Sequence, residues 1–220
     1  MPRDKLEEKL YSPVVQALKS MFDIWYCEQS QHYGGKLGDK YRPQSHPISE
    51  IENPHLEITA HGEFSEELKL RKFNYYMFEQ LFAEQLQPDI LGYVIKSTGK
   101  KQSPIETIAV EVKAHELTLR DLMQAKLYET VFGAKHTFLL SPQGMTGEKM
   151  EVVLRHGSLL RGNVVIGKCN ENGKVLLFDP RLVDYVPKEL RQFCNATRYH
   201  SDIAFASNLF EASKRSSDSF

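Results

Sequence analysis

Two acidic residues and a lysine are spaced in a way that suits hydrolytic chemistry. Asp89 follows Pro88, and Glu111 and Lys113 lie two residues apart further along the chain. Alternate residues of a β-strand point to the same face, so Glu111 and Lys113 would project together while Val112 turns the other way. Carboxylates bind Mg²⁺, and bound Mg²⁺ activates water and polarises phosphates. The predicted chemistry is therefore metal-dependent hydrolysis of a phosphodiester.

The intervening segment predicts how Asp89 reaches the other two residues. Residues 88–95 and 105–114 are rich in β-branched and aromatic side chains, and a polar stretch with lysine and glycine separates them. We expect an antiparallel hairpin with its midpoint at residue 100 or 101. That register places Asp89 opposite Glu111 to Lys113, where opposed side chains lie close. It also predicts a buried face made of Ile90, Val94, Ile108, Val110 and Val112.

A helix is predicted ahead of the hairpin, over residues 4–22. Its apolar residues recur with the helical period, and Glu7 lies beside that stripe, where it is either a surface acid or a group that points into a site. Ser12-Pro13 would cap a new turn or kink the helix. Residues 24–29, Ile-Trp-Tyr-Cys-Glu-Gln, have the composition of a strand, and we expect them to be the first strand of the sheet.

A second helix is predicted over residues 118–132. Thr118 fits the N-cap, Asp121 the capping-box position and Gly133 a C-terminal stop. The apolar stripe predicted to face the core consists of Leu119, Leu122, Met123, Leu127 and Val131.

Less specific patterns surround these elements. Residues 30–62 are a long polar stretch with irregularly spaced histidines and no partner cysteines, which favours solvated loop histidines over a zinc site. Residues 65–87 read as a helix whose aromatic side chains favour core packing over base stacking. Residues 136–141 are predicted to be a strand parallel to the one before the second helix. The four histidines of the polar stretch over residues 30–62 are His32, His46, His55 and His61.

The C-terminal third carries no identifiable chemistry. Residues 147–160 read as a helix, and residues 164–168 and 174–178 as strands joined by an Asn-Gly turn. A short helix is predicted around residues 188–194. Residues 206–220 read as a frayed helix or a disordered tail.

Four motifs resemble those of the PD-(D/E)xK nuclease superfamily: Pro88-Asp89, Glu111-Val112-Lys113, the helical acid Glu7, and Gln124-Ala-Lys-Leu-Tyr128. The Gln-x-x-x-Tyr motif, on the helix after the Glu-x-Lys strand, is similar to the motif that the RecB-like branch of the superfamily carries at this place. The resemblance implies a nuclease with a restriction-endonuclease-like core, an α/β fold in which helices flank a mixed central sheet.

The resemblance also divides the chain. It covers about residues 4–30 and 86–141, so residues 31–86 are expected to be an inserted helical and loop segment. Residues 142–205 would form an α+β C-terminal extension. We expect one domain over residues 1–205.

The predicted metal site is made of oxygen ligands. Mg²⁺ is a hard cation, so Asp89, Glu111 and the carbonyl of Val112 suit it, and Mn²⁺ would substitute. Lys113 would orient or help to deprotonate the attacking water and neutralise charge on the phosphate. Glu7 would be an outer metal ligand if it reaches the site.

By resemblance, Gln124 and Tyr128 would position Lys113 or the substrate phosphates. A plainer interpretation stays open for both pairs. Glu111 and Lys113 would then be a solvated pair, and Gln124 and Tyr128 a pair on a helix surface.

Charge and cysteine content limit the partners. The net charge of −1 excludes a globally basic nucleic-acid binder, so phosphate contacts would come from local groups such as the turn lysines, unless these are merely solvated. The RecB-like helix favours DNA ends or single strands over a specific duplex site, with RNA left open. The turn lysines, in the predicted turn of the hairpin, are Lys96, Lys100 and Lys101.

Three scattered cysteines predict reduced thiols in a cytoplasmic protein, and they cannot supply the four ligands of the iron-sulfur cluster that many CRISPR-associated members hold. No segment approaches a membrane span. The alternative function is a catalytically inactive nuclease-fold module that binds nucleic acid, a protein partner or a second copy of itself.

Overall fold

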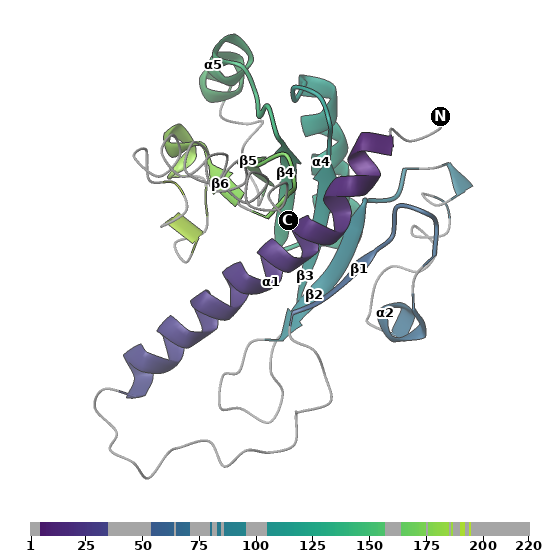
Figure 1. Cartoon of the computed structure of the whole chain (residues 1–220), viewed down its shortest axis with the longest axis vertical. Coiled ribbons are helices and arrows are strands. Elements are labelled where there is room, and N and C mark those ends of the chain that lie inside the picture. The colour runs from purple at the N-terminus through teal and green to yellow at the C-terminus, as the bar shows by residue number, and fades with distance from the viewer. Residues whose placement is uncertain are drawn as a thin grey trace, which may run out of the picture.

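Six strands form one mixed sheet in the order β1-β2-β3-β4-β5-β6, and helices flank it (Figure 1). In the computed structural model the strands are β1 (His55–Ile58), β2 (Ile90–Ile95), β3 (Ile105–Val112), β4 (His136–Ser141), β5 (Val164–Cys169) and β6 (Leu176–Phe178). The helices are α1 (Lys5–Gly34), α2 (Glu66–Leu70), α4 (Leu119–Phe132) and α5 (Gly147–Arg155). The predicted α/β class with a mixed, helix-flanked sheet is confirmed.

The structure describes residues 5–34, 54–63, 65–70, 80, 83–84, 86–95, 105–156, 164–174, 176–184, 186, 190–191 and 194, and the side chains of α1 as far as Phe22. Several predicted features lie outside these residues. They are the turn lysines Lys96, Lys100 and Lys101, most of the helices predicted over residues 65–87 and 188–194, and the tail 206–220.

The β2–β3 hairpin has the predicted register. The strands are antiparallel, and Ile90 pairs with Val110 while Ile95 pairs with Ile105, so the pairing is symmetric about residue 100. All five residues predicted for its buried face belong to the largest hydrophobic core cluster. The hairpin is therefore confirmed in both its pairing and its orientation.

Helix α1 corrects the first predicted strand. Residues 24–29 lie inside α1, which continues across Pro13 and ends at Gly34. Their β-branched and aromatic composition favours a strand locally, but no glycine or proline interrupts the chain between Pro13 and Gly34. Intrinsic propensity is a weak guide when a helix already formed upstream can simply be extended.

The edge strand β1 corrects the prediction that residues 31–86 are a helical and loop segment. His55–Ile58 pairs antiparallel with β2, with Leu56 opposite Gly92. A Cβ on Gly92 would lie 2.0 Å from the carbonyl oxygen of His55, so this close pairing requires glycine. His55 is also not a solvated loop residue, because its ring stacks on Tyr93 with centroids 5.2 Å apart.

Helix α4 has the predicted ends but a different buried face. Thr118 and Asp121 form the capping box, and Gly133 ends the helix in the left-handed conformation with φ 60°. The predicted stripe is wrong at Leu119 and Met123, which are 38% and 54% exposed. The residues that α4 buries are Asp121, Leu122, Ala125, Tyr128 and Phe132. Asp121 is polar and Tyr128 is amphipathic, so the pattern of apolar residues alone predicted a different buried face.

The C-terminal third continues the same sheet. Strand β4 pairs parallel with β3 as predicted, β5 pairs parallel with β4, and β6 folds back antiparallel on β5. Gly173 in the β5–β6 turn has φ 70°, as an Asn-Gly hairpin turn requires. A Cβ at Gly173 would lie 3.0 Å from the carbonyl oxygen of Leu10 and 3.1 Å from Cβ of Pro13, so this turn rests against α1.

Helices α1 and α4 lie on opposite faces of the sheet. α1 crosses the sheet obliquely and contacts β1, β3 and β6, whereas α4 contacts β3, β4 and β5 (Figure 1). On β3, Val110 packs in the cluster that contains Val14 of α1, and Ala109 packs with Tyr128 of α4. The carboxyl end of β3 is therefore within reach of side chains from both helices. Among the described helices, none is long and apolar enough to span a membrane.

Candidate active site

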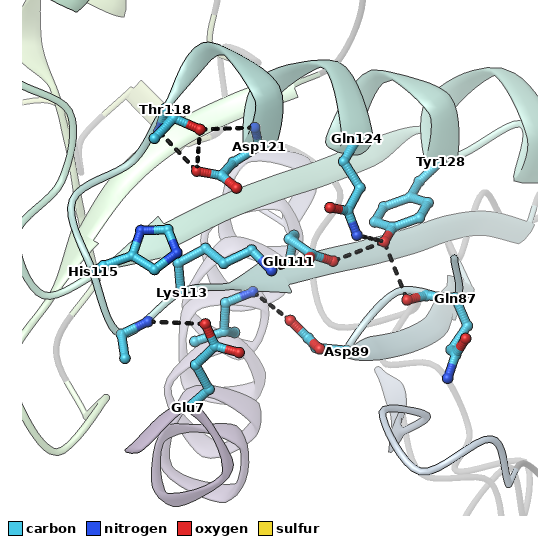
Figure 2. Close-up of polar contacts among 12 residues, drawn as sticks. Glu7, Gln87, Asp89, Glu111, Lys113, His115, Thr118, Asp121, Gln124 and Tyr128 are labelled. Carbon is cyan, nitrogen blue, oxygen red and sulfur yellow. Dashed lines mark hydrogen bonds and ion pairs between the residues drawn. The ribbon is translucent and has the colours of Figure 1, made fainter. Parts of the chain in front are cut away.

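Asp89, Glu111 and Lys113 converge at the open end of the β2–β3 hairpin (Figure 2). Asp89 precedes β2 and extends the ladder by one residue, because its N–H donates to the carbonyl of Val110 at 3.0 Å. This extension sets Asp89 across from Glu111, as the symmetric register predicts. The structure thus brings together the three residues that the spacing of the sequence singles out.

Hydrogen bonds fix both the backbone and the side chain of Asp89. Its Oδ2 accepts from the N–H of Val112 at 2.8 Å, and its Oδ1 accepts from the hydroxyl of Tyr11 at 3.1 Å. Its carbonyl accepts from the N–H groups of Thr59 and Ala60 at 2.9 and 3.1 Å. Asp89 is 2% exposed. Its carboxylate therefore cannot rotate without breaking hydrogen bonds in a buried environment.

Sequence reasoning missed Tyr11 and Thr59. Tyr11 follows Glu7 by one helical turn and shares its face, a signal that was available in the predicted helix. Thr59 directly follows β1, and its hydroxyl donates to the carbonyl of Pro88 at 2.7 Å. No local signal marks Thr59, because its role depends on the pairing of β1 with β2.

Glu111 is the centre of a buried polar network supplied by α4 (Figure 2). Its Oε1 lies 2.6 Å from Nζ of Lys113, and its Oε2 accepts from the hydroxyl of Tyr128 at 2.8 Å. Nε2 of Gln124 donates to the Tyr128 oxygen at 2.6 Å. Because Glu111 is 2% exposed and Tyr128 is fully buried, these are not the solvated surface pairs of the plainer interpretation.

The network acts on Glu111 more directly than the resemblance implies. Gln124 and Tyr128 were expected to position Lys113 or the substrate phosphates. In the structure Tyr128 bonds to Glu111, which in turn pairs with Lys113. The Tyr128 hydroxyl also lies 3.1 Å from the carbonyl oxygen of Gln87. A phenol has one hydrogen, so Tyr128 donates to Glu111 or to Gln87 at any moment.

Glu7 and Val112 border the acids from α1 and β3. Glu7 is 7% exposed, and its Oε1 accepts from the N–H of Ala114 at 3.4 Å, so it borders the site from α1. The N–H of Val112 points to Asp89, whereas the N–H of Lys113 bonds to Leu140 of β4. In a strand the N–H and C=O of one residue point to the same side, so the Val112 carbonyl also faces the Asp89 side.

The site buries acidic side chains whose charged forms are disfavoured. Burial, and then the charge of Asp89, raise the pKa of Glu111 to about 8, although Lys113 and Tyr128 act against this rise. Burial also raises the pKa of Glu7. Burial opposes the charged form of Lys113, but the charge and hydrogen bond of Glu111 outweigh it and raise the pKa of Lys113. Lys113 alone therefore does not compensate these acids.

The donor set fits a hard divalent cation in its chemistry. Two buried carboxyl groups and a backbone carbonyl are the oxygen ligands that Mg²⁺ and Mn²⁺ accept, and a bound cation would favour the ionised forms of the acids. Among the described residues, however, no three His, Cys, Asp or Glu side chains are arranged to hold a metal ion. Glu111 faces Lys113 and Tyr128, so it would have to exchange Lys113 for the cation.

The metal-free protein is expected to lose stability as the pH rises through the pKa of Glu111. That pKa is higher in the folded protein than in the unfolded chain, so the folded state binds more protons. The stabilisation is complete below the ordinary glutamate value and is lost as the pH passes about 8. Urea unfolding at about pH 6 and about pH 9 measures this loss, which we expect to be on the order of 2 kcal/mol in the free energy of unfolding.

The variant Glu111→Gln provides the control for this pH effect. It keeps the shape of the side chain but cannot titrate, so its stability should fall less between the two pH values. Equal pH dependence in the native protein and in Glu111→Gln would contradict the prediction.

Comparison with protein-family models, with curated proteins and with solved structures finds no match to this chain.

Proposed function

We propose that this protein is a metal-dependent nuclease of the PD-(D/E)xK type, with a restriction-endonuclease-like core and a RecB-like helix. The observation that carries the proposal is the convergence of the buried Asp89 and Glu111 with the half-buried Lys113, together with the bond of Tyr128 from the next helix to Glu111. An ordinary stabilising ion pair has no need of a second buried acid, since burying excess charge is costly. A hydrolytic metal site does need a second acid, because the cation takes more than one carboxylate ligand.

Each residue has a defined part in the proposed reaction. Asp89, Glu111 and the Val112 carbonyl would hold Mg²⁺ or Mn²⁺, with Glu7 outside them. The bound cation would supply Lewis-acid polarisation of the phosphate and an acidified water. Lys113 would carry its positive charge to the phosphate and orient the attacking water. Gln124 and Tyr128 would keep the Glu111 carboxylate in place.

The proposed substrate is DNA, more at ends or on single strands than at a specific duplex sequence. This choice follows the likeness of Gln124 and Tyr128 to the RecB-like branch, and RNA is tested beside DNA. Lys96, Lys100 and Lys101 are proposed phosphate contacts. We also propose a cytoplasmic location, which suits the free, buried thiols of Cys169 and Cys194.

Cleavage assays test the proposal directly. The native protein is incubated with end-labelled linear DNA, circular single-stranded and duplex DNA, and RNA, each with Mg²⁺, with Mn²⁺ or with a chelator. We expect cleavage that requires the cation and that Asp89→Asn prevents. Shortening of linear DNA while circles survive would identify an exonuclease. Cleavage that Asp89→Asn leaves intact would contradict the assignment.

The alternative is an inactive nuclease-fold module that binds nucleic acid, a protein partner or a second copy. The presence of both acids and the lysine argues against it. Binding of labelled DNA without cleavage, under all cation conditions, would favour this alternative over the enzyme.

A further inference from the structure

We propose that Tyr11 is a positioning residue that sets the orientation of the Asp89 carboxylate for a divalent cation. This inference rests on the proposed metal site but concerns a residue outside the four motifs that resemble the nuclease superfamily. Tyr11 is 1% exposed, and its hydroxyl donates to Oδ1 of Asp89 at 3.1 Å. The bond joins the first helix to the start of the second strand.

Tyr11 and Tyr128 form equivalent contacts from opposite sides of the sheet. The Tyr128 hydroxyl of α4 donates to Oε2 of Glu111, and the Tyr11 hydroxyl of α1 donates to Oδ1 of Asp89. Each acid of the proposed cation site is therefore bonded to one buried phenol. Groups that hydrogen-bond metal ligands orient them, and their loss lowers metal affinity or activity by about 10-fold to 100-fold.

The contact acts on the orientation of the Asp89 carboxylate. Oδ2 of Asp89 is held by the N–H of Val112, so Tyr11 and Val112 together determine the plane of the carboxylate. Loss of the Tyr11 hydroxyl would remove the bond to Oδ1 of Asp89 and leave the bond from Val112 to Oδ2 in place.

A purely structural role would have a different signature. The Tyr11 ring packs in the largest hydrophobic core cluster, so a truncation would destabilise the fold whether or not Asp89 binds a cation. Tyr11→Phe keeps the ring and removes only the hydroxyl. Its effect on cation binding therefore reports on the bond to Asp89.

Tyr93 provides a matched control. Its ring is also fully buried, and its hydroxyl donates to the carboxylate of Glu67, away from Asp89 and Glu111. Tyr93→Phe thus removes the same chemical group from an equivalent bond elsewhere in the protein. Loss of stability is expected in both variants, but loss of cation affinity only in Tyr11→Phe.

The experiment is calorimetric titration of Mn²⁺ into the full-length native protein, Tyr11→Phe and Tyr93→Phe, with thermal unfolding of each in chelator. We expect Mn²⁺ affinity to fall about 10-fold in Tyr11→Phe and to stay at the native value in Tyr93→Phe. In the Asp89→Asn background, adding Tyr11→Phe should change the affinity by less than about 2-fold, because coupled residues are not additive.

The outcomes separate this inference from the proposed function. Native Mn²⁺ affinity in Tyr11→Phe would overturn the role of Tyr11, even if the native protein cleaves DNA. Equal loss in Tyr11→Phe and Tyr93→Phe would also overturn it, because the loss would then follow from destabilisation. A selective loss in Tyr11→Phe supports it, even if no nucleic acid is cleaved.

Discussion

Replacement of Lys113 by methionine is expected to reduce cleavage by at least about 100-fold, the usual scale of a lost group that assists proton transfer. Nζ of Lys113 lies 2.6 Å from Oε1 of Glu111, and the side chain is 16% exposed. Methionine keeps the apolar stem that packs in this half-buried position but removes the positive charge. In the proposed reaction, that charge orients water and neutralises the phosphate, so its loss should slow cleavage. Initial rates at saturating Mg²⁺ measure the loss.

Lys126 is the matched control for this substitution. It pairs with Glu129 at 3.1 Å on α4, and its side chain is 21% exposed, so Lys126→Met removes a similar ion pair away from the acids. We expect the native rate in Lys126→Met. We also expect Lys113→Met to retain Mn²⁺ binding, because it removes a cation that competes for Glu111. A native cleavage rate in Lys113→Met would disprove the role of Lys113.

The second large effect is expected from Gly92→Ala. A Cβ at this position would lie 2.0 Å from the carbonyl oxygen of His55 and 2.8 Å from Cδ2 of Leu56. The first clash is with backbone, so a rotamer change cannot relieve it, and β1 must move away from β2. We expect a loss of about 3 kcal/mol or more in the free energy of unfolding, the upper end for overpacked sites.

Cleavage should also fall in Gly92→Ala, because β1 leads directly into the Thr59 and Ala60 groups that hold the Asp89 carbonyl. Gly147→Ala is the control, since a Cβ there would meet nothing within 4 Å at the exposed start of α5. Urea unfolding and cleavage rates are measured on both variants. Native stability in Gly92→Ala would show that β1 does not pair closely with β2.

The parts of the site that could be predicted from the sequence depend on local signals. The hairpin register follows from two apolar strands and a short polar turn, so the meeting of Asp89 with Glu111 follows from spacing alone. The ends of α4 follow from Thr118, Asp121 and Gly133, whose chemistry acts within one helical turn. These features need no knowledge of the rest of the chain.

The parts that were missed depend on tertiary pairing. β1 has four residues in a polar stretch, and only its pairing with β2 makes it a strand. On α4, the buried face carries Asp121 and Tyr128, so the apolar residues that remain, such as Met123, indicated the wrong face. Buried side chains with polar groups, here one in the helix cap and one bonded to Glu111, disturb the apolar pattern from which burial is predicted.

The contact of the β5–β6 turn with α1 has a consequence for the newly made chain. α1 carries Glu7 and Tyr11 and is synthesised before the turn at Gly173, which rests against Leu10 and Pro13. Until that hairpin arrives, part of the apolar face of α1 has no cover, and domains generally complete their folding as units. The proposed hydrolase would thus be complete only after the β5–β6 hairpin has been synthesised, even though the residues of its site precede that hairpin in the sequence.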